Sequence, residues 1–315
     1  MTSQIKIGVS SCLTGNNVRY DGRHKHNCYI TDVLGRFFQL VPVCPEVGCG
    51  MPIPREAMCL AGDPAAPRLM TIRTRIDTTA QMLEFCNRKV GELESEGLCG
   101  FIFKKGSPSC GLSGVKVCNR GVPARRGSGL FAAAMVGHFP LLPVEEEGRL
   151  NDPAIRENFI ERVFTQRRWM DFMLGGQSIG ALVTFHTSHK LLIMAHSPGH
   201  YREMGAVVAH GTEMPLDQLL ERYRLLLMEA MALHATVRKQ TNVLHHVMGY
   251  FRKVLTAAEK AELVEVIARY HDHLVPLTAP LTLLRNYASR YDQSYLTGQV
   301  YLNQHPAELM LRNHV

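Results

Sequence analysis

Short apolar runs alternate with amphipathic stretches in the first half of the chain. The runs are IKIGVS (5–10), FFQLVPVC (37–44), LCGFIFKK (98–105) and, as a candidate fourth, FPLLPV (139–144). Residues 78–96 place apolar side chains at helical spacing with charged residues between them, which predicts a covering helix. Strands that alternate with helices are typical of an open, mainly parallel sheet flanked by helices, so we expect an α/β fold here.

The pattern changes at residues 147–154, EGRLNDPA, where a glycine precedes an Asn-Asp-Pro sequence. Asn or Asp ahead of a proline is typical of a helix start. Beyond this point apolar residues recur at spacings of three to five, and Thr256 with Glu259 forms a capping-box pattern. We therefore predict two domains, an α/β domain over residues 1–150 and an all-α domain over residues 156–315.

The composition indicates a globular protein and argues against an integral membrane protein. With 46% hydrophobic and 20% charged residues, the chain is typical of a globular protein, and no apolar run approaches the roughly 18 residues of a membrane helix. The first residues enter an alternating stretch without the apolar core of an export signal, so we expect a cytoplasmic protein that makes no membrane contact. The net charge of +7 permits an acidic partner such as RNA but does not indicate one.

All nine cysteines fall within the first 118 residues. An odd count without an export signal argues against a complete disulfide framework and favours metal binding or reactive chemistry. Cys12, Cys44 and Cys110 each lie in a turn at or after the end of a predicted strand. Because open parallel sheets bind ligands at the carboxyl ends of their strands, these three thiols are the candidates for a shared site.

Three interpretations of these thiols stay open on spacing alone. They could hold an iron-sulfur cluster or another metal, one could be a reactive catalytic cysteine, or all could be inert and buried. Structural zinc typically uses pairs such as C-x-x-C, which the chain lacks, although Cys44 and Cys49 come near. Small flanking residues leave room for an inorganic group whose sulfurs accept backbone hydrogen bonds.

The segments CLTGNNVRYDG, CPEVGCGMPIPRE and KKGSPSCG resemble the three signature motifs of the thiouracil desulfidase family. The later segments HTSHKLLIMAHSPGHYREMG, NVLHHVMGYFRKVL and SYLTGQVYLNQHPAEL resemble the helical domain often fused behind it, and the fused arrangement is similar to the tRNA 4-thiouridine desulfidases. This resemblance implies a 4Fe-4S cluster held by Cys12, Cys44 and Cys110, with one iron lacking a protein ligand. Relatives commonly carry glycine or an aliphatic residue at the position of Cys49, which could compete with Cys44.

The implied activity is removal of sulfur from 4-thiouridine in tRNA to give uridine, without net redox change. The open iron would take the thiocarbonyl sulfur while water attacks the adjacent carbon. Such hydrolysis needs a proton shuttle and a donor that holds the base, so Glu46 and Ser107 are the catalytic candidates. Ser109 is expected to bind the base or the sulfide. The alternatives are an exposed or capping carboxylate for Glu46 and a turn hydroxyl for Ser107.

The segment RYDGRHKHN gathers basic side chains around an aromatic one. Such a group can meet a phosphate backbone and stack on an unpaired base, which predicts substrate-binding roles for Arg19, Tyr20 and Lys25. The alternative is a solvated loop in which Arg19 pairs with a carboxylate. Two other functions stay open: a desulfidase of free thiouracil or thionucleosides, and a non-catalytic iron-sulfur sensor.

Histidines are concentrated in the second half, and four of them have spacings that could be drawn as a zinc site: His186, His189, His196 and His200. We favour instead a polar helical face that these histidines form with Lys190, Tyr201 and Arg202. The resemblance implies that this half binds RNA, and His245, His246, Arg252 and Lys253 could contribute contacts. We find no independent RNA-binding motif in it.

Overall fold

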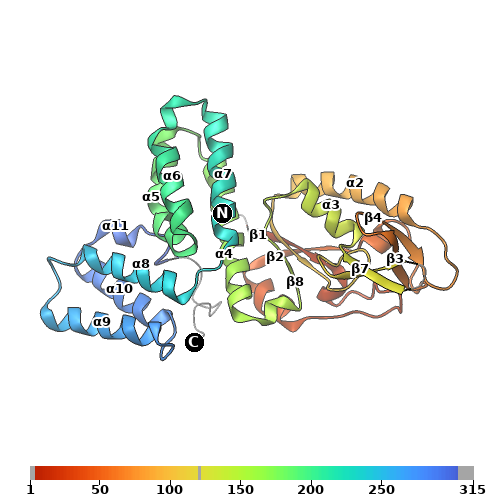
Figure 1. The fold of residues 1–315 in the computed structure, drawn as a ribbon, viewed down its shortest axis with the longest axis horizontal. Helices are drawn as coiled ribbons and strands as arrows, with labels where there is room; N and C mark the ends of the chain where they lie inside the picture. Colours follow the sequence, from red (N-terminus) through yellow and green to blue (C-terminus); the bar gives the residue numbers. More distant parts are fainter. Residues whose placement is uncertain (1–3, 120–121, 304–315) are drawn as a thin grey trace. The chain divides into compact units, whose positions relative to one another are not determined.

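The computed structural model describes residues 4–119 and 122–303 and divides the chain into two compact units, residues 1–152 and 153–315 (Figure 1). All described strands belong to the first unit, and the elements described in the second unit are helices. The predicted fold class, an open and mainly parallel sheet with flanking helices followed by an all-α part, is confirmed.

The first unit is built on a four-stranded parallel sheet with the order β2-β1-β5-β8. β1 (Ile5–Ser10) pairs with β2 (Phe38–Val43) on one side and β5 (Leu98–Phe103) on the other, and β8 (Val144–Glu146) extends the sheet beyond β5. β5 is buried along its whole length, as expected for a parallel strand covered on both faces.

The fourth predicted strand was placed too early. The segment FPLLPV forms a turn through most of its length, and β8 begins only at its last residue, Val144. The physical reason lies in Pro140 and Pro143, which have no N–H to donate to a strand ladder.

A second four-stranded sheet, in the order β4-β3-β6-β7, was not predicted. β3 (Met58–Asp63) pairs antiparallel with β4 (Ala66–Thr71) and parallel with β6 (Val115–Asn119), which pairs antiparallel with β7 (Val122–Gly127). Glycine, proline or arginine interrupts the apolar alternation of β3, β4 and β7, and β6 has only five residues, so none of the four shows a clear hydrophobic period of two.

Two helices of the first unit, α2 (Thr79–Glu96) and α3 (Leu130–His138), pack against each other beside the strands (Figure 1). The helix expected over residues 78–96 is thus confirmed. The remaining helical segments are short: η1 (Ser11–Thr14), η2 (Tyr29–Val33), η3 (Leu34–Arg36), α1 (Pro45–Gly48) and η4 (Arg149–Asn151).

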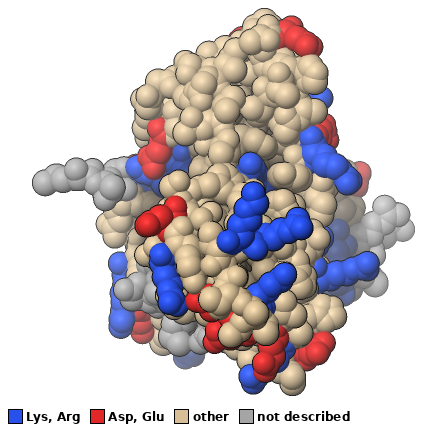
Figure 2. All heavy atoms as spheres, turned by 90° about the vertical axis from the view of Figure 1, so that its left-hand side faces the viewer, with Lys and Arg blue, Asp and Glu red and all other residues tan. Residues whose placement is uncertain are grey.

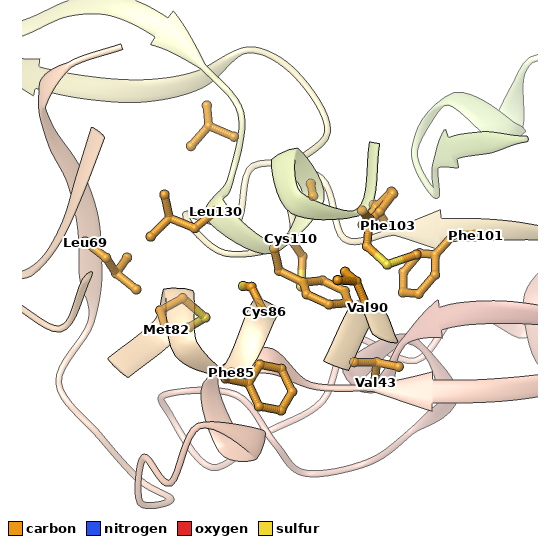
Figure 3. Packing of buried hydrophobic residues seen from close by; sticks show 14 of the residues in the cluster. Val43, Leu69, Met82, Phe85, Cys86, Val90, Phe101, Phe103, Cys110 and Leu130 are labelled. Carbon is orange, nitrogen blue, oxygen red and sulfur yellow. The ribbon is translucent and has the colours of Figure 1, made fainter. Parts of the chain in front are cut away.

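The hydrophobic core of the first unit lies between α2, α3 and the strands (Figure 3). Phe101 and Phe103 of β5 stack with ring centroids 4.3 Å apart, and Phe131 of α3 meets both rings edge-on. The ring of Phe85 in α2 contacts that of Phe131 in a tilted arrangement, with centroids 6.4 Å apart. Cys110 is buried in the same core, so packed side chains hold the loop that carries it in place.

The second unit is a helical assembly: α4 (Pro153–Leu174), α5 (Ile179–His196), α6 (Pro198–Ala209), η5 (Gly211–Glu213), α7 (Leu216–Ala232), α8 (Val237–Tyr250), α9 (Ala257–His271), α10 (Thr278–Arg290) and α11 (Ser294–Thr297). The capping box of Thr256 and Glu259 is present at the start of α9. The segment SYLTGQVYLNQHPAEL runs beyond residue 303 and lies partly outside the described residues. No helix among those described is long and apolar enough to cross a membrane.

The prediction that the histidines of α5 form a polar, solvent-facing surface is wrong. His186, His189 and His196 are buried, because α5 packs against α7 and α8 and these neighbours cover the stripe. Burial lowers the pKa of His186 to about 4 and that of His189 to about 3, so both rings are neutral near pH 7. Among the described residues, these histidines take part in no group of three or more side chains able to hold a metal ion.

Candidate functional site

The carboxyl ends of three adjacent parallel strands bring three cysteines together. β1 is followed by Cys12 in the turn η1, and β2 is followed directly by Cys44, which precedes α1. β5 is followed by the loop that carries Cys110. Because β2, β1 and β5 are neighbours in a parallel sheet, their ends lie at the same edge, which is where such sheets bind ligands.

These thiols line one cavity of about 330 Å³. Its wall also contains five other residues singled out from the sequence: Arg19, Tyr20, Glu46, Ser107 and Ser109. Lys25 is not among the described residues that line it; the Lys25 backbone N–H donates to the carbonyl of Cys12 at 2.8 Å, and its side chain is exposed. A cavity of this size, with a few polar groups converging on it, suits a small ligand or a single base.

The three thiols share a desolvated environment. Burial raises the pKa of Cys12 to about 11, against the opposing charge of Lys104, and burial also raises the pKa values of Cys44 and Cys110. Beyond burial, a hydrogen bond with the Ser10 side chain lowers the pKa of Cys110, while the charges of Glu46, Cys44 and Cys12 raise it. Thiols of this kind are protonated until a metal displaces the protons.

The spacing of the thiols does not suit a single metal ion. No three Cys, His, Asp or Glu side chains in the described part of the chain converge closely enough to hold one ion, as a zinc site would require. Cys12, Cys44 and Cys110 are free thiols that form no disulfide. Three separated thiols around a cavity larger than one ion fit a polynuclear iron-sulfur group, which spreads its ligands over several irons.

Cys49 lies away from this cavity. Its Sγ donates a hydrogen bond to the carbonyl oxygen of Glu46 at 3.2 Å, and its side chain packs against the core beside α2. Cys49 is not among the described residues that line the cavity, whereas Cys44 is. The geometry therefore favours Cys44 as the thiol of this motif that faces a ligand.

Glu46 stands at the centre of a hydrogen-bond network in the cavity wall. The Ser109 hydroxyl donates to Glu46 Oε1 at 2.6 Å, and the hydroxyls of Ser107 and Ser109 lie 2.9 Å apart. On the other side, the Arg55 guanidinium donates to Glu46 Oε2. Arg55 was not among the residues predicted for the site, although it lies in the second motif, in PIPRE.

The loop that holds Cys110 is fixed by its own serine. Ser107 Oγ accepts hydrogen bonds from the backbone N–H of Cys110 at 3.1 Å and of Ser109 at 3.3 Å. The Gly111 N–H donates to the Ser107 carbonyl at 2.8 Å, and Gly129 in turn donates to the Gly111 carbonyl. Ser107 thus forms the turn that presents Cys110, and its hydroxyl lies beside that of Ser109 in the cavity wall.

We expect Gly129→Ala to displace this loop. A Cβ at Gly129 would lie 2.5 Å from the carbonyl carbon of Ser109 and 2.9 Å from the nitrogen of Cys110, so the backbone must move. The expected cost is about 1–3 kcal/mol of unfolding free energy, together with a lower iron content after reconstitution. Thermal unfolding and iron analysis measure both. Gly137→Ala is the control, since a Cβ there meets no atom within 4 Å; equal behaviour of the two variants would contradict the prediction.

Four cationic side chains line the cavity: Arg19, Arg55, Lys104 and Lys105. Three of them pair with carboxylates: Arg19 with Asp21, Arg55 with Glu46 and Lys104 with Glu147. Within the described residues, the ammonium of Lys105 forms no ion pair with a carboxylate. Lys105 is exposed, so the lining of the cavity includes one cationic residue that is not paired with a carboxylate in the described part of the chain.

The fold and the site define the class of this domain: an α/β domain whose parallel sheet has a thiol-lined cavity at its carboxyl edge, next to a paired carboxylate. Comparison with known proteins identifies its family. Residues 7–147 match the family model described as 2-thiouracil desulfurase, and residues 190–306 match DUF1722, described as a protein family of unknown function. The chain belongs to the 2-thiouracil desulfurase family and carries a DUF1722 region behind that domain.

Individual relatives were also found. The uncharacterized protein YbgA of Escherichia coli (strain K12) is 35% identical over 139 residues, which are 44% of this chain and 82% of YbgA. The uncharacterized protein YbbK of Bacillus subtilis (strain 168) is 30% identical over 138 residues, 38% of this chain and 86% of YbbK. A solved structure, the [4Fe-4S]-dependent thiouracil desulfidase TudS, matches with 32% identity and a TM-score of 0.40, over 47% of this chain and 94% of TudS.

Proposed function

We propose that the protein is a hydrolytic desulfidase that converts 4-thiouridine in tRNA to uridine, with a 4Fe-4S cluster held by Cys12, Cys44 and Cys110. The observation that carries the proposal is the meeting of three thiols, buried at Cys12 and Cys110 and half-buried at Cys44, with Glu46 in one cavity of a 2-thiouracil desulfurase domain. When bound, the cluster would supply a thiophilic Lewis-acidic iron for the thiocarbonyl sulfur.

In this mechanism, side chains that line the cavity transfer the protons. Glu46 accepts a proton from the attacking water, and Ser109, which already donates to the same carboxylate, holds its Oε1 toward the cavity. The oxygen of that water becomes the new carbonyl oxygen of the base. The sulfur leaves as hydrogen sulfide with both protons of the water, so no electron is gained or lost.

Features of the cavity mouth support a nucleotide rather than a free base. Tyr20 is 42% exposed while lining the cavity, and the Arg19 guanidinium lies 5.6 Å from its ring centroid. An exposed aromatic ring suits stacking on an extruded base, and Lys105 supplies a positive charge for an adjacent phosphate. A free thiouracil carries no phosphate for that charge to meet.

The second unit carries an aromatic and basic platform, formed by Lys190, His246, Tyr250 and Tyr295. The rings of Tyr250 and Tyr295 stack with centroids 4.9 Å apart, and the Lys190 ammonium lies 4.8 Å from the Tyr295 centroid. His246 meets Tyr250 edge-on. Figure 2 shows several Lys and Arg side chains near the middle of the face turned to the viewer, with Asp and Glu side chains around them. Stacked rings beside cations are typical of surfaces that bind nucleic acid.

The test is anaerobic incubation of the cluster-loaded protein with tRNA containing 4-thiouridine and, separately, with the 4-thiouridine nucleoside and 4-thiouracil. We expect conversion of the tRNA to its uridine form with the highest kcat/KM. The double variant Lys190→Ala and Tyr250→Ala should lose about tenfold in kcat/KM on tRNA, as for the loss of a stacking contact, and nothing on the nucleoside. Nucleoside analysis of the digested RNA measures this.

Lys260→Ala, an exposed position on α9, is the control and should leave both activities unchanged. A higher kcat/KM on free 4-thiouracil than on tRNA would assign the free base as substrate. An intact cluster that converts none of the three substrates would favour a sensor.

A further inference from the structure

We propose that Arg55 is a positioning residue that holds both Glu46 and the loop of Arg19 and Tyr20 in place around the cavity. This inference rests on the proposed desulfidase function. Arg55 follows α1 in the second motif, and its side chain is only 6% exposed, against 13% for Glu46. The pair is therefore a nearly dehydrated part of the cavity wall rather than a surface ion pair.

Arg55 fixes the orientation of the Glu46 carboxylate. Arg55 Nε donates to Glu46 Oε2 at 2.9 Å, and Nη2 donates to the same oxygen. The other oxygen, Oε1, is left to Ser109, which donates to it at 2.6 Å. The Glu46 carboxylate thus accepts two hydrogen bonds from Arg55 and one from Ser109, and its rotation would break all three. A planar guanidinium presents two donors at once, which a lysine ammonium cannot reproduce in this geometry.

The same residue holds the loop of the first motif, with one contact from its side chain and one from its backbone. Arg55 Nη2 also donates to the carbonyl of Val18 at 2.9 Å, and the Arg55 backbone N–H donates to the carbonyl of Tyr20 at 2.8 Å. Residues 37 positions apart in the sequence are therefore joined by one guanidinium. Because Arg19 stands between these two carbonyls, Arg55 determines where the substrate-binding candidates lie relative to Glu46.

A purely stabilising role and a positioning role predict different results. If Arg55 only stabilised the fold, its replacement would lower the melting temperature without changing the turnover of each loaded site. If Arg55 positions Glu46, its replacement lowers kcat, because small displacements of a catalytic group are costly in rate. The effect on kcat would also vanish once Glu46 itself is removed.

The experiment compares Arg55→Lys and Arg55→Met in the full-length, cluster-loaded protein with wild type. Expected is a fall of about 100-fold in kcat per cluster, with unchanged cluster absorbance. In a double-mutant cycle, Arg55→Met combined with Glu46→Gln should be no slower than Glu46→Gln alone. The matched control is Arg68→Lys, an arginine that pairs with Asp77 on the surface of the same unit and should keep full activity.

A second readout does not depend on activity. Amide hydrogen exchange of residues 16–22 should be faster in both Arg55 variants than in wild type, and unchanged in Arg68→Lys. Unchanged kcat per cluster, fully additive losses in the cycle, or wild-type exchange in this segment would each overturn the proposal. If Arg55→Met does not fold, Arg55→Lys alone decides. If wild type and Arg68→Lys convert no thiolated substrate, the proposed function fails, whereas the exchange measurement still tests Arg55.

Discussion

Replacing Cys110 by alanine is expected to abolish both cluster assembly and desulfuration, with turnover falling by about 10⁴-fold or more, as for the loss of an essential group. Cys110 is 6% exposed and belongs to both the core and the cavity wall. Two remaining thiols would leave the cluster without a third anchor, while the loss of one buried sulfur atom costs the fold little. Iron and sulfide analysis, visible absorbance and conversion of 4-thiouridine in tRNA measure the outcome.

Two other cysteines serve as controls for this prediction. Cys86 is fully buried in the same core but does not line the cavity, so Cys86→Ala should keep the cluster. Cys49→Ala should also keep it, because the Cys49 thiol points to the Glu46 carbonyl. Loss of the cluster in Cys49→Ala with retention in Cys44→Ala would replace Cys44 by Cys49 in the ligand set. A normal cluster in Cys110→Ala would exclude Cys110 as a ligand.

The main sheet was predictable because its strands are continuous apolar runs. Residues 5–10, 38–43 and 98–103 are strands in the structure, and all three begin and end within two residues of the predicted runs. Once the sheet is parallel, the thiols that follow its strands must lie at one edge. The second sheet escaped prediction because its pairing joins strands of weak pattern, such as β3 with β6, across the third motif.

The supporting contacts of the site could not be predicted from local pattern. Glu46 and Ser109 are 63 residues apart, and Arg55 and Val18 are 37 apart, so only the folded chain makes them partners. The buried histidines of α5 illustrate the same limit. Their spacing predicts that they lie on one side of a helix. Whether that side faces water or packs against α7 depends on the other helices, which the sequence of α5 alone does not reveal.

Glu46→Gln is expected to lower kcat by about 10²–10⁴-fold, the usual contribution of a positioned general base, with the cluster retained. The amide keeps the size of the side chain and an oxygen that can accept from Arg55, but it cannot take a proton from water. Turnover per cluster with tRNA containing 4-thiouridine measures the loss. Glu96→Gln, at a surface pair with Lys6, is the control and should behave as wild type.

Glu46→Gln separates three roles of the Glu46 carboxylate: proton transfer, support of Cys44 and neutralisation of the Arg55 charge. A fall in kcat with normal iron content supports proton transfer by Glu46, whereas loss of the cluster would make Glu46 a structural partner of the adjacent Cys44. A lower melting temperature is also expected, because Arg55 would keep a buried charge without a counter-charge. Full turnover in Glu46→Gln would contradict water activation by Glu46, and the water would then have to be activated through the Ser107 and Ser109 hydroxyls or by solvent.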